Sequence, residues 1–349
     1  MKHIRLFKFI ILMSFPIAGI VHYLIPIISW LKLQDLLLSC IVLTIYYFGF
    51  FIGNQYVLLS KASLSRIAGT FLSAHVISSL IFAIYGYGIF SIFFSLIIGI
   101  TTGGLLSLPS YTIAKPPINF IISFTPLLGA IIIFNYGFDE ILLFSALLAF
   151  LFSLLLLFSF KIIVAKPKLI EETNNSLTLE GIFLAFGMGL SGSIINLLIP
   201  IIALTIFNSN VIYIGLAITI SLIIIQLIGW KISKYDKIHR SLGSFINTSL
   251  FFSILLMSFT SDILILLILW TLALIDISFF NSFIIIVNRS IKKFNEYKFI
   301  TLTSLFSTLG PILSFLLWNC IDYRSIFYLA SFLVLINWLI IRKIIRDVE

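Results

Sequence analysis

Asp276 stands out among the 13 acidic residues of this chain because it lies near the middle of a long apolar run, between Ile263 and Val287. A charged aspartate at the centre of a membrane helix costs about 2.5 to 3.5 kcal/mol, so it should face a cavity or a partner. A carboxyl in that position could exchange protons near neutral pH and carry a proton across a membrane. The alternative is a protonated or hydrogen-bonded side chain that only ties its helix to a neighbour.

His22 and Asn196 occupy matched positions of an internal repeat. The pentapeptide Leu-Ile-Pro-Ile-Ile occurs twice, around Pro26 and around Pro200, at an offset of 174 positions, and each polar residue lies four positions before its proline. We therefore expect both side chains to face one central space. A histidine titrates at about pH 6.5 and could bind substrate or pass a proton. A structural hydrogen bond to a neighbouring helix is the alternative for each residue.

Two threonines are candidate partners of Asp276. At the same offset of 174, Thr102 corresponds to Asp276, and Thr101 precedes it. Both could line the space opposite the carboxyl, and ordinary hydrogen bonding between helices is equally compatible with the sequence.

The composition predicts an integral membrane protein. Of the 349 residues, 61% are hydrophobic and 10% are charged, and the mean hydropathy is +1.20, which excludes a soluble domain with a polar surface. Twelve apolar runs are long enough to cross a bilayer as helices. They extend over Phe7–Trp30, Leu36–Leu59, Leu64–Tyr85, Ile89–Ala114, Ile118–Tyr136, Ile141–Ile163, Leu179–Phe207, Val211–Trp230, Leu242–Phe259, Ile263–Val287, Phe299–Trp318 and Ser325–Ile341.

The basic residues are distributed unevenly between the two ends of these runs. If the N-terminus is cytoplasmic, 20 of the 22 lysines and arginines fall on the cytoplasmic side, and only Lys32 and Arg324 fall on the other. This asymmetry predicts a multi-pass protein of the inner or plasma membrane with both termini in the cytoplasm. It also accounts for the net charge of +9 without a nucleic-acid partner.

The repeat predicts two bundles of six helices. We expect an N-terminal bundle at residues 1–165, a cytoplasmic linker at 166–178 and a C-terminal bundle at 179–349. Pro126 and Pro311 extend the repeat at an offset of 185, because the second half is longer. Since each half has an even number of helices, the halves share one orientation in the membrane, as in the parallel repeats of secondary transporters.

The chain resembles the major facilitator superfamily over essentially its whole length. The segment Gly229–Lys237 is similar to the glycine-and-basic turn of that family, and Thr125–Gly129 and Leu309–Pro311 are similar to the proline–glycine motif of its exporters. The turn Gly53–Arg66 departs from the family because it lacks the usual acidic residue. The resemblance implies an all-α fold, alternating access, and a substrate cavity lined by helices one, four, seven and ten.

Prolines and basic turns are candidate conformational elements. Prolines remove helix hydrogen bonds and can create bends used in rocking, or simply static kinks. The basic residues can anchor cytoplasmic turns, and the resemblance implies that such turns also latch the halves together. These candidates are Pro26, Pro126, Pro200, Pro311, Lys61, Arg66, Lys234 and Arg240.

Taken together, these patterns favour a transporter rather than an enzyme. No phosphate loop, zinc-ligand cluster or nucleophile triad is recognisable, so we expect no cofactor and no bound metal. The preferred function is proton-coupled export of a small amphipathic compound, such as a drug-like molecule, a metabolite or a siderophore-type chelator. We expect the lipid bilayer, the substrate and protons as partners, and a monomer. The alternatives are a nutrient importer or facilitator, and a membrane scaffold or assembly factor that transports nothing.

Overall fold

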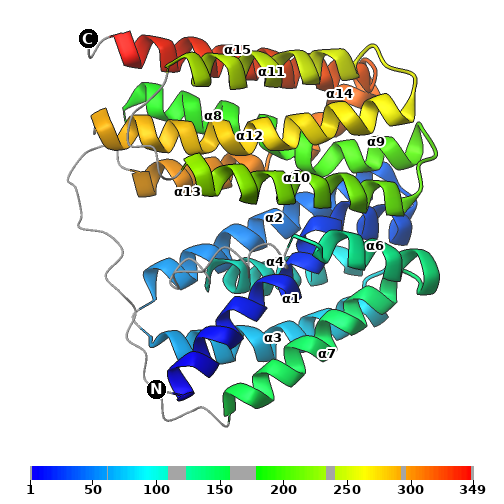
Figure 1. Cartoon of the computed structure of the whole chain (residues 1–349). Helices are drawn as coiled ribbons and strands as arrows, with labels where there is room; N and C mark the ends of the chain where they lie inside the picture. The colour runs from blue at the N-terminus through cyan, green and yellow to red at the C-terminus, as the bar shows by residue number, and fades with distance from the viewer. Residues whose placement is uncertain are drawn as a thin grey trace. The chain divides into compact units, whose positions relative to one another are not determined.

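The computed structural model describes residues 2–60, 62–108, 123–157, 178–232, 240–291 and 296–346, and their regular secondary structure is helical (Figure 1). The chain divides into two compact units, Met1–Glu171 and Glu172–Glu349. The division falls within the predicted linker at 166–178, of which only Thr178 is a described residue. Each unit is described on its own.

The helices of the N-terminal unit follow the predicted runs closely. The predicted bounds of the second and third runs agree with the structure, and the first helix is longer at both ends than its run. The helices are α1 (Lys2–Leu33), α2 (Leu36–Leu59), α3 (Leu64–Tyr85), α4 (Phe90–Ser107), α6 (Thr125–Tyr136) and α7 (Phe138–Leu157).

In the C-terminal unit two of the predicted runs are interrupted. A π-helix, η2, divides the seventh run, and a turn at Thr308–Leu309 divides the eleventh. The elements are α8 (Leu179–Ser193), η2 (Ile194–Leu198), α9 (Ile199–Thr205), α10 (Val211–Ile232), α11 (Arg240–Met257), α12 (Ile263–Ile291), α13 (Glu296–Ser307), α14 (Gly310–Cys320) and α15 (Arg324–Arg346).

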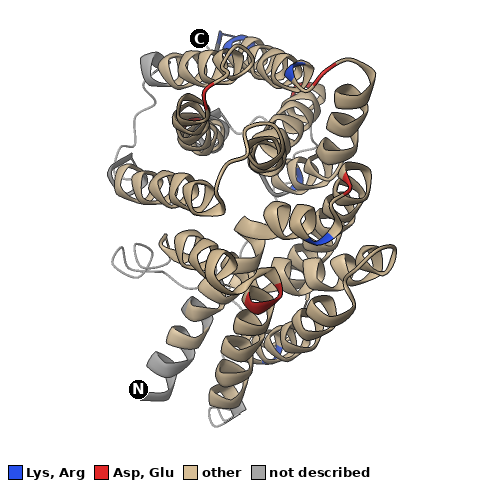
Figure 2. Ribbon diagram, turned by 90° about the vertical axis from the view of Figure 1, so that its right-hand side faces the viewer, with Lys and Arg blue, Asp and Glu red and all other residues tan. Residues whose placement is uncertain are grey.

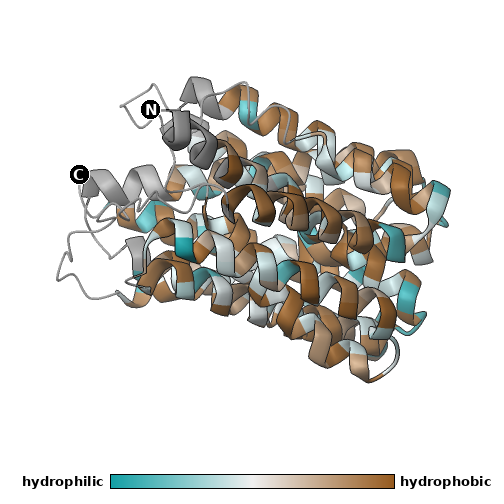
Figure 3. Cartoon of the chain, turned by 90° about the horizontal axis from the view of Figure 1, so that it is seen from below, coloured by the Kyte–Doolittle hydropathy of each residue, from teal (hydrophilic) through white to brown (hydrophobic). Residues whose placement is uncertain are grey.

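The lengths and hydropathy of these helices fit a membrane. Within the described residues, ten helical stretches are long and apolar enough to span a bilayer, and Thr125–Tyr136 and Gly243–Met257 are shorter apolar helices. Most residues of the helices are hydrophobic (Figure 3), and the acidic and basic residues lie mostly near helix ends (Figure 2). The predicted all-α membrane fold with about twelve helices is confirmed.

Polar side chains fix where several helices begin. Asp35 caps α2, because its Oδ1 accepts the backbone N–H of Leu38 at 2.7 Å. Asp262 does the same for α12 through the N–H groups of Leu264 and Ile265. Such caps pair backbone donors that the first helical turn leaves free, so they stop one apolar run and start the next.

Glycines allow α2 and α4 to pack backbone to backbone. A side chain at Gly49 or Gly53 would collide with the backbone of α4, and one at Gly99 or Gly103 would collide with the backbone of α2. Small residues at four-residue spacing permit this close approach in membrane helices. These glycines therefore serve the close packing of α2 against α4.

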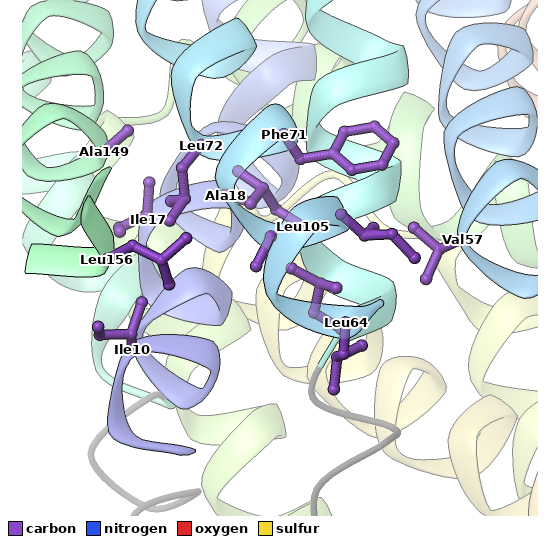
Figure 4. Close-up of a cluster of buried hydrophobic side chains, with 13 residues drawn as sticks. Ile10, Ile17, Ala18, Val57, Leu64, Phe71, Leu72, Leu105, Ala149 and Leu156 are labelled. Carbon is purple, nitrogen blue, oxygen red and sulfur yellow. The ribbon is translucent and has the colours of Figure 1, made fainter. Parts of the chain in front are cut away.

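Apolar clusters hold each unit together. In the N-terminal unit, Ile10 and Ile17 of α1, Leu72 of α3, Leu105 of α4 and Leu156 of α7 contribute to one cluster (Figure 4). The C-terminal unit has a cluster rich in phenylalanine that joins residues of α8, α11, α12, α13 and α15. The polar residues considered next are set between helices that these clusters hold in place.

Candidate functional site

Asp276 lies near the middle of α12 and is only partly satisfied. The residue is 8% exposed, and Ser249 of the neighbouring helix α11 lies close to its carboxyl group. The second carboxyl oxygen, Oδ2, has no hydrogen-bond partner among the described residues. A buried polar atom normally has a partner, so this oxygen remains available to a proton, a water molecule or a ligand.

Asn196 lies on the π-helix η2 and is exposed. Its Nδ2 donates to the carbonyl of Gly192 at 2.7 Å, one turn earlier in the same segment. The side chain is therefore oriented by its own helix rather than by another one. This position leaves it accessible, as a substrate contact would require.

The π-helix has a specific cause in the sequence around Pro200. In π register each N–H bonds to the carbonyl five residues earlier, and for position 200 that carbonyl belongs to Ile195. Pro200 has no N–H to donate, and the indole Nε1 of Trp270, from α12, donates to Ile195 O at 2.8 Å instead. Trp270 thus fastens the helix that carries Asp276 to the helix that carries Asn196.

His22 lies at the centre of a group of aromatic rings in the N-terminal unit. Its Nδ1 lies 3.3 Å from the hydroxyl of Tyr46, and its ring stacks on Phe50 with centroids 4.7 Å apart. The rings of Tyr23 and Tyr47 lie at 5.5 and 5.6 Å. These contacts hold the imidazole in one orientation on α1, against α2.

Thr101 and Thr102 have different surroundings although they are adjacent. The Thr101 hydroxyl belongs to a buried network, 3.1 Å from His75 Nδ1 and 3.1 Å from Ser78 Oγ. Thr102 is also buried and lies close to the Tyr46 hydroxyl, but its Oγ1 forms no hydrogen bond of good geometry with a described residue. Of the two threonines, Thr102 is the one close to Tyr46, whose hydroxyl contacts His22.

His75 connects three helices of the N-terminal unit. Besides Thr101 of α4, it contacts Ser145 of α7, whose Oγ lies 2.9 Å from Nε2. Ser145 in turn donates to the carbonyl of Ile17 on α1 at 2.9 Å. Both ring nitrogens of His75 are thus engaged in a buried network that joins these helices.

The four candidate prolines all lie at or within helices. Pro26 is inside α1, which continues as an α-helix around it. Pro126, Pro200 and Pro311 each occupy the first turn of a helix, namely α6, α9 and α14. Three of the four therefore coincide with the start of a new helical segment, and a role in rocking stays a prediction.

The basic candidates are only partly described. Arg66 is exposed in the first turn of α3, and Arg240 is the first residue of α11. Lys61 and Lys234 lie outside the described residues. Their proposed latch function stays a prediction.

The sequence analysis missed an ion pair between Lys32 and Asp139. The Lys32 side chain is 1% exposed, and its Nζ lies 2.5 Å from Asp139 Oδ1. Nζ also donates to the carbonyls of Phe82 and Ala83 at 2.8 Å each, at the C-terminal end of α3. All three ammonium protons thus have acceptors, which is what a buried lysine requires.

Tyr87 covers this ion pair. Its ring centroid lies 4.2 Å from Lys32 Nζ, and its hydroxyl donates to Asp139 Oδ2 at 2.7 Å. The hydrogen bond to the carboxylate, together with desolvation, raises the pKa of Tyr87 to about 12. The tyrosine therefore stays protonated and remains a donor throughout the physiological pH range. A lysine and an aspartate at the ends of apolar runs were the only signal of this site in the sequence.

Three asparagines of the C-terminal unit that have buried side-chain polar atoms were also missed. Asn247, Asn281 and Asn337 each have at least one side-chain polar atom without a partner among the described residues, and Asn337 packs directly against Gly187 of α8. An amide inside a long apolar run is a recognisable signal for function or helix contacts. No group of three or more His, Cys, Asp or Glu side chains within the described ranges could hold a metal ion.

Comparison with known proteins identifies the fold. Neither a protein-family model nor a curated protein sequence matches the chain. The nucleoside transporter NupG, in a mutant form, matches with a TM-score of 0.70 at 15% identity, over 97% of this chain and 99% of that one. A bacterial homologue of the iron transporter ferroportin, in its inward-facing state, gives 0.63 at 12% identity over 98% of both chains.

A third solved structure, a bacterial homologue of the human lysosomal transporter Spinster in an inward-facing and occupied conformation, is similar to the same extent. It has a TM-score of 0.65 at 11% identity and covers 98% of this chain and 97% of that one. These structures are of the major facilitator type. The chain therefore has the fold of that superfamily.

Proposed function

We propose that the protein is a secondary active transporter that exports a small amphipathic compound in exchange for protons. The observation that carries the proposal is Asp276, a buried carboxyl group near the middle of a membrane-spanning helix with one oxygen unpartnered. Its cost in a membrane makes such a residue a functional candidate by default. The similarity to three transporters over nearly the whole chain supports the transport class.

In alternating access, Asp276 would be shielded from water in one state and reached by water in another. This change in solvation would drive the proton step. When the carboxyl is closed off from water, low dielectric favours its neutral, protonated form. When water reaches Oδ2, the charged form is solvated and the proton can leave. At a membrane potential of about 150 mV, each charge moved supplies about 3.5 kcal/mol, enough for roughly 300-fold accumulation.

The other predicted site residues have complementary roles in this proposal. His22 and Thr102, which both adjoin Tyr46, would contact substrate from the N-terminal unit. Asn196 would do so from the C-terminal unit, and His22 is the second candidate for proton exchange. Thr101 is less suited to contact substrate because it belongs to the buried network of His75.

The direction of transport and the membrane orientation are also parts of the proposal. The proline–glycine segments Thr125–Gly129 and Leu309–Pro311 favour an exporter, and the basic asymmetry favours cytoplasmic termini in the inner or plasma membrane. The cargo does not follow from the fold, because one fold serves many functions. The similar structures themselves include a nucleoside transporter and a bacterial homologue of an iron transporter.

Substitution of Asp276 by Asn tests the coupling role. Asn preserves size and hydrogen bonding but cannot release a proton, so transport driven by a pH gradient should be abolished. We would measure gradient-driven uptake of ethidium, an amphipathic cation, and of a panel of neutral aromatic compounds and chelators into proteoliposomes. Asp276→Glu, which keeps the proton chemistry, should retain more flux than Asp276→Asn.

The controls separate the proposal from its rivals. Exchange of labelled substrate without a gradient should persist in Asp276→Asn if only coupling is lost. Undiminished gradient-driven flux in Asp276→Asn would refute the coupling role. Movement of substrate in the same direction as protons, rather than in the opposite direction, would favour an importer. Lack of flux by the wild-type protein across the whole panel would favour a membrane scaffold.

A further inference from the structure

His22 lies in a compact aromatic cluster, and the four rings around it have no role in the proposed proton exchange. The cluster consists of His22 and Tyr23 on α1 and of Tyr46, Tyr47 and Phe50 on α2. Four rings lie within 6.2 Å of the imidazole, centroid to centroid. Tyr46 is buried, whereas the other four members are half-buried, so their rings are partly accessible.

Two hydroxyl groups of the cluster, those of Tyr23 and Tyr47, have no hydrogen-bond partner among the described residues. Tyr23 lies within the apolar span Pro16–Leu33 and Tyr47 near the middle of Leu36–Leu59. In the part of the chain that the structure describes, neither phenol forms a hydrogen bond, and neither is among the fully enclosed polar atoms. A hydroxyl facing hydrocarbon without a partner is unfavourable. Both groups should therefore face water or a polar ligand rather than lipid.

His22 provides a third polar group with a fixed direction. Its Nδ1 is engaged by the Tyr46 hydroxyl, and stacking on Phe50, with 26° between the planes, restrains the ring. Its Nε2 has no hydrogen bond with any residue in the described ranges. The cluster thus combines partly accessible ring faces with three polar groups that can receive a ligand.

We infer that the aromatic cluster is a binding subsite for a planar aromatic or heteroaromatic substrate that carries a hydrogen-bonding group. The substrate ring packs against the rings of Phe50 and Tyr47 by offset or edge-to-face contacts. Its polar edge meets the hydroxyls of Tyr23 and Tyr47 and Nε2 of His22. This inference rests on the proposed transport function, and it narrows the amphipathic cargo to compounds with an aromatic ring.

A matched pair of neutral probes tests this preference without requiring transport. Benzamide and cyclohexanecarboxamide carry the same amide group and differ in whether the ring is aromatic. Saturation-transfer NMR with the protein in lipid nanodiscs detects weak binding of each, and empty nanodiscs give the lipid background. We expect the signal of benzamide to exceed that of its saturated analogue by about threefold or more.

Three variants test whether the preference for benzamide arises at the aromatic cluster. Phe50→Leu keeps an apolar side chain of similar volume but removes the stacking face, so it should abolish the preference for benzamide. The double substitution Tyr23→Phe and Tyr47→Phe keeps the rings and removes the hydroxyls, so it should weaken both probes and retain the preference. Phe94→Leu, in a separate aromatic pair with Tyr85 of the same unit, is the matched control and should change nothing.

The outcomes are distinct from those of the coupling test. Equal binding of the two probes by the wild-type protein, or a preference that survives Phe50→Leu, would overturn the subsite. An equal loss of the preference for benzamide in Phe94→Leu would also overturn the subsite, because any loss of an aromatic side chain would then have the same effect. If Phe50→Leu does not fold, the tyrosine double variant still decides, since unchanged binding there contradicts the assigned hydroxyls. Asp276→Asn should bind benzamide normally, so failure of proton coupling leaves this inference intact.

Discussion

The two units contain the same pentapeptide, Leu-Ile-Pro-Ile-Ile, in two different local structures. Around Pro26 the chain is part of one uninterrupted α-helix, α1. Around Pro200 a π-helix ends immediately before the segment that contains the proline, and the span is divided into α8, η2 and α9. Because the five residues are identical, the difference must come from the residues around them.

The neighbouring positions of the repeat contain different hydrogen-bonding groups. The π-helix is held by the Trp270 indole, which donates to Ile195 O, whereas the residue at the matched position of the N-terminal unit is Leu96, which has no donor in its side chain. In α1 the hydroxyl of Ser29 donates to Pro26 O, and the matched residue of the second unit is Ala203. A proline removes one helix bond, and its neighbours decide how the backbone responds.

The units also differ in the contacts of the charged side chains near the ends of their helices. In the N-terminal unit Asp139 pairs with the buried Lys32. At the offset that relates Pro126 to Pro311, Asp139 corresponds to Arg324, which is exposed and contacts the ring of Tyr323. At the offset of 174, Lys32 corresponds to Ile206. The repeat therefore preserves the positions of helices and prolines but not the interactions that stabilise them.

The largest expected effect comes from breaking the ion pair of the N-terminal unit. Asp139→Asn leaves the Lys32 ammonium group buried without its counter-charge. We expect a loss of about 3 kcal/mol in the free energy of unfolding in detergent, at the low end for a buried pair, because the Asp139 side chain is 29% exposed. The double variant Lys32→Met and Asp139→Asn should recover most of this loss.

Arg324→Gln is the matched control at the corresponding position of the second unit. Since Arg324 is exposed, its replacement should leave the melting temperature unchanged. Equal losses of stability in Asp139→Asn and Arg324→Gln would show that the ion pair does not make the N-terminal unit more sensitive than the C-terminal unit to loss of a charge at this position.

A smaller effect is expected from removing the indole donor of the C-terminal unit. Trp270→Phe keeps a buried aromatic ring but leaves Ile195 O without its partner, which should cost about 1 to 3 kcal/mol. Hydrogen exchange should increase selectively in residues 194–205, because the interrupted span loses its attachment to α12.

Trp318→Phe is the control for this substitution. Trp318 is half-buried and contacts the Tyr323 ring, with centroids 6.2 Å apart, and its replacement should change stability by no more than about 0.5 kcal/mol. Unchanged exchange around Pro200 in Trp270→Phe would show that the π-helix does not depend on this bond.

The smallest effect is expected for Tyr87→Phe, which removes the hydroxyl group above the ion pair of Lys32 and Asp139. The variant therefore distinguishes the contribution of the hydroxyl from that of the ring. The ring over Lys32 is kept, and only the hydrogen bond to Asp139 is lost. The free energy of unfolding should fall by about 0.5 to 1 kcal/mol, since Tyr87 is 45% exposed. Tyr87→Leu, which also removes the ring, should be more destabilising. Equal effects of the two variants would assign no stabilisation to the ring itself.

Three candidate residues were recognised from the sequence because each is a polar side chain that interrupts an apolar run. Asp276, His22 and Asn196 were identified in this way, and the structure places Asp276 in a buried, partly satisfied position. The sequence could not separate Thr101 from Thr102, because adjacent helix residues point in directions about 100° apart and the packing of neighbouring helices decides their surroundings. It also missed the pair of Lys32 and Asp139, which are distant in sequence.

The membrane class, the approximate number of helices and the internal repeat follow from the amino-acid sequence alone. In hydrocarbon the backbone must satisfy its own hydrogen bonds, so the length and composition of each apolar run dictate a helix without reference to its neighbours. Only the tertiary structure decided the partners of Asp276, His22 and Lys32 and the local register before Pro200. These depend on side chains from different helices meeting within about 3 Å, a distance set by helix packing that no single run specifies.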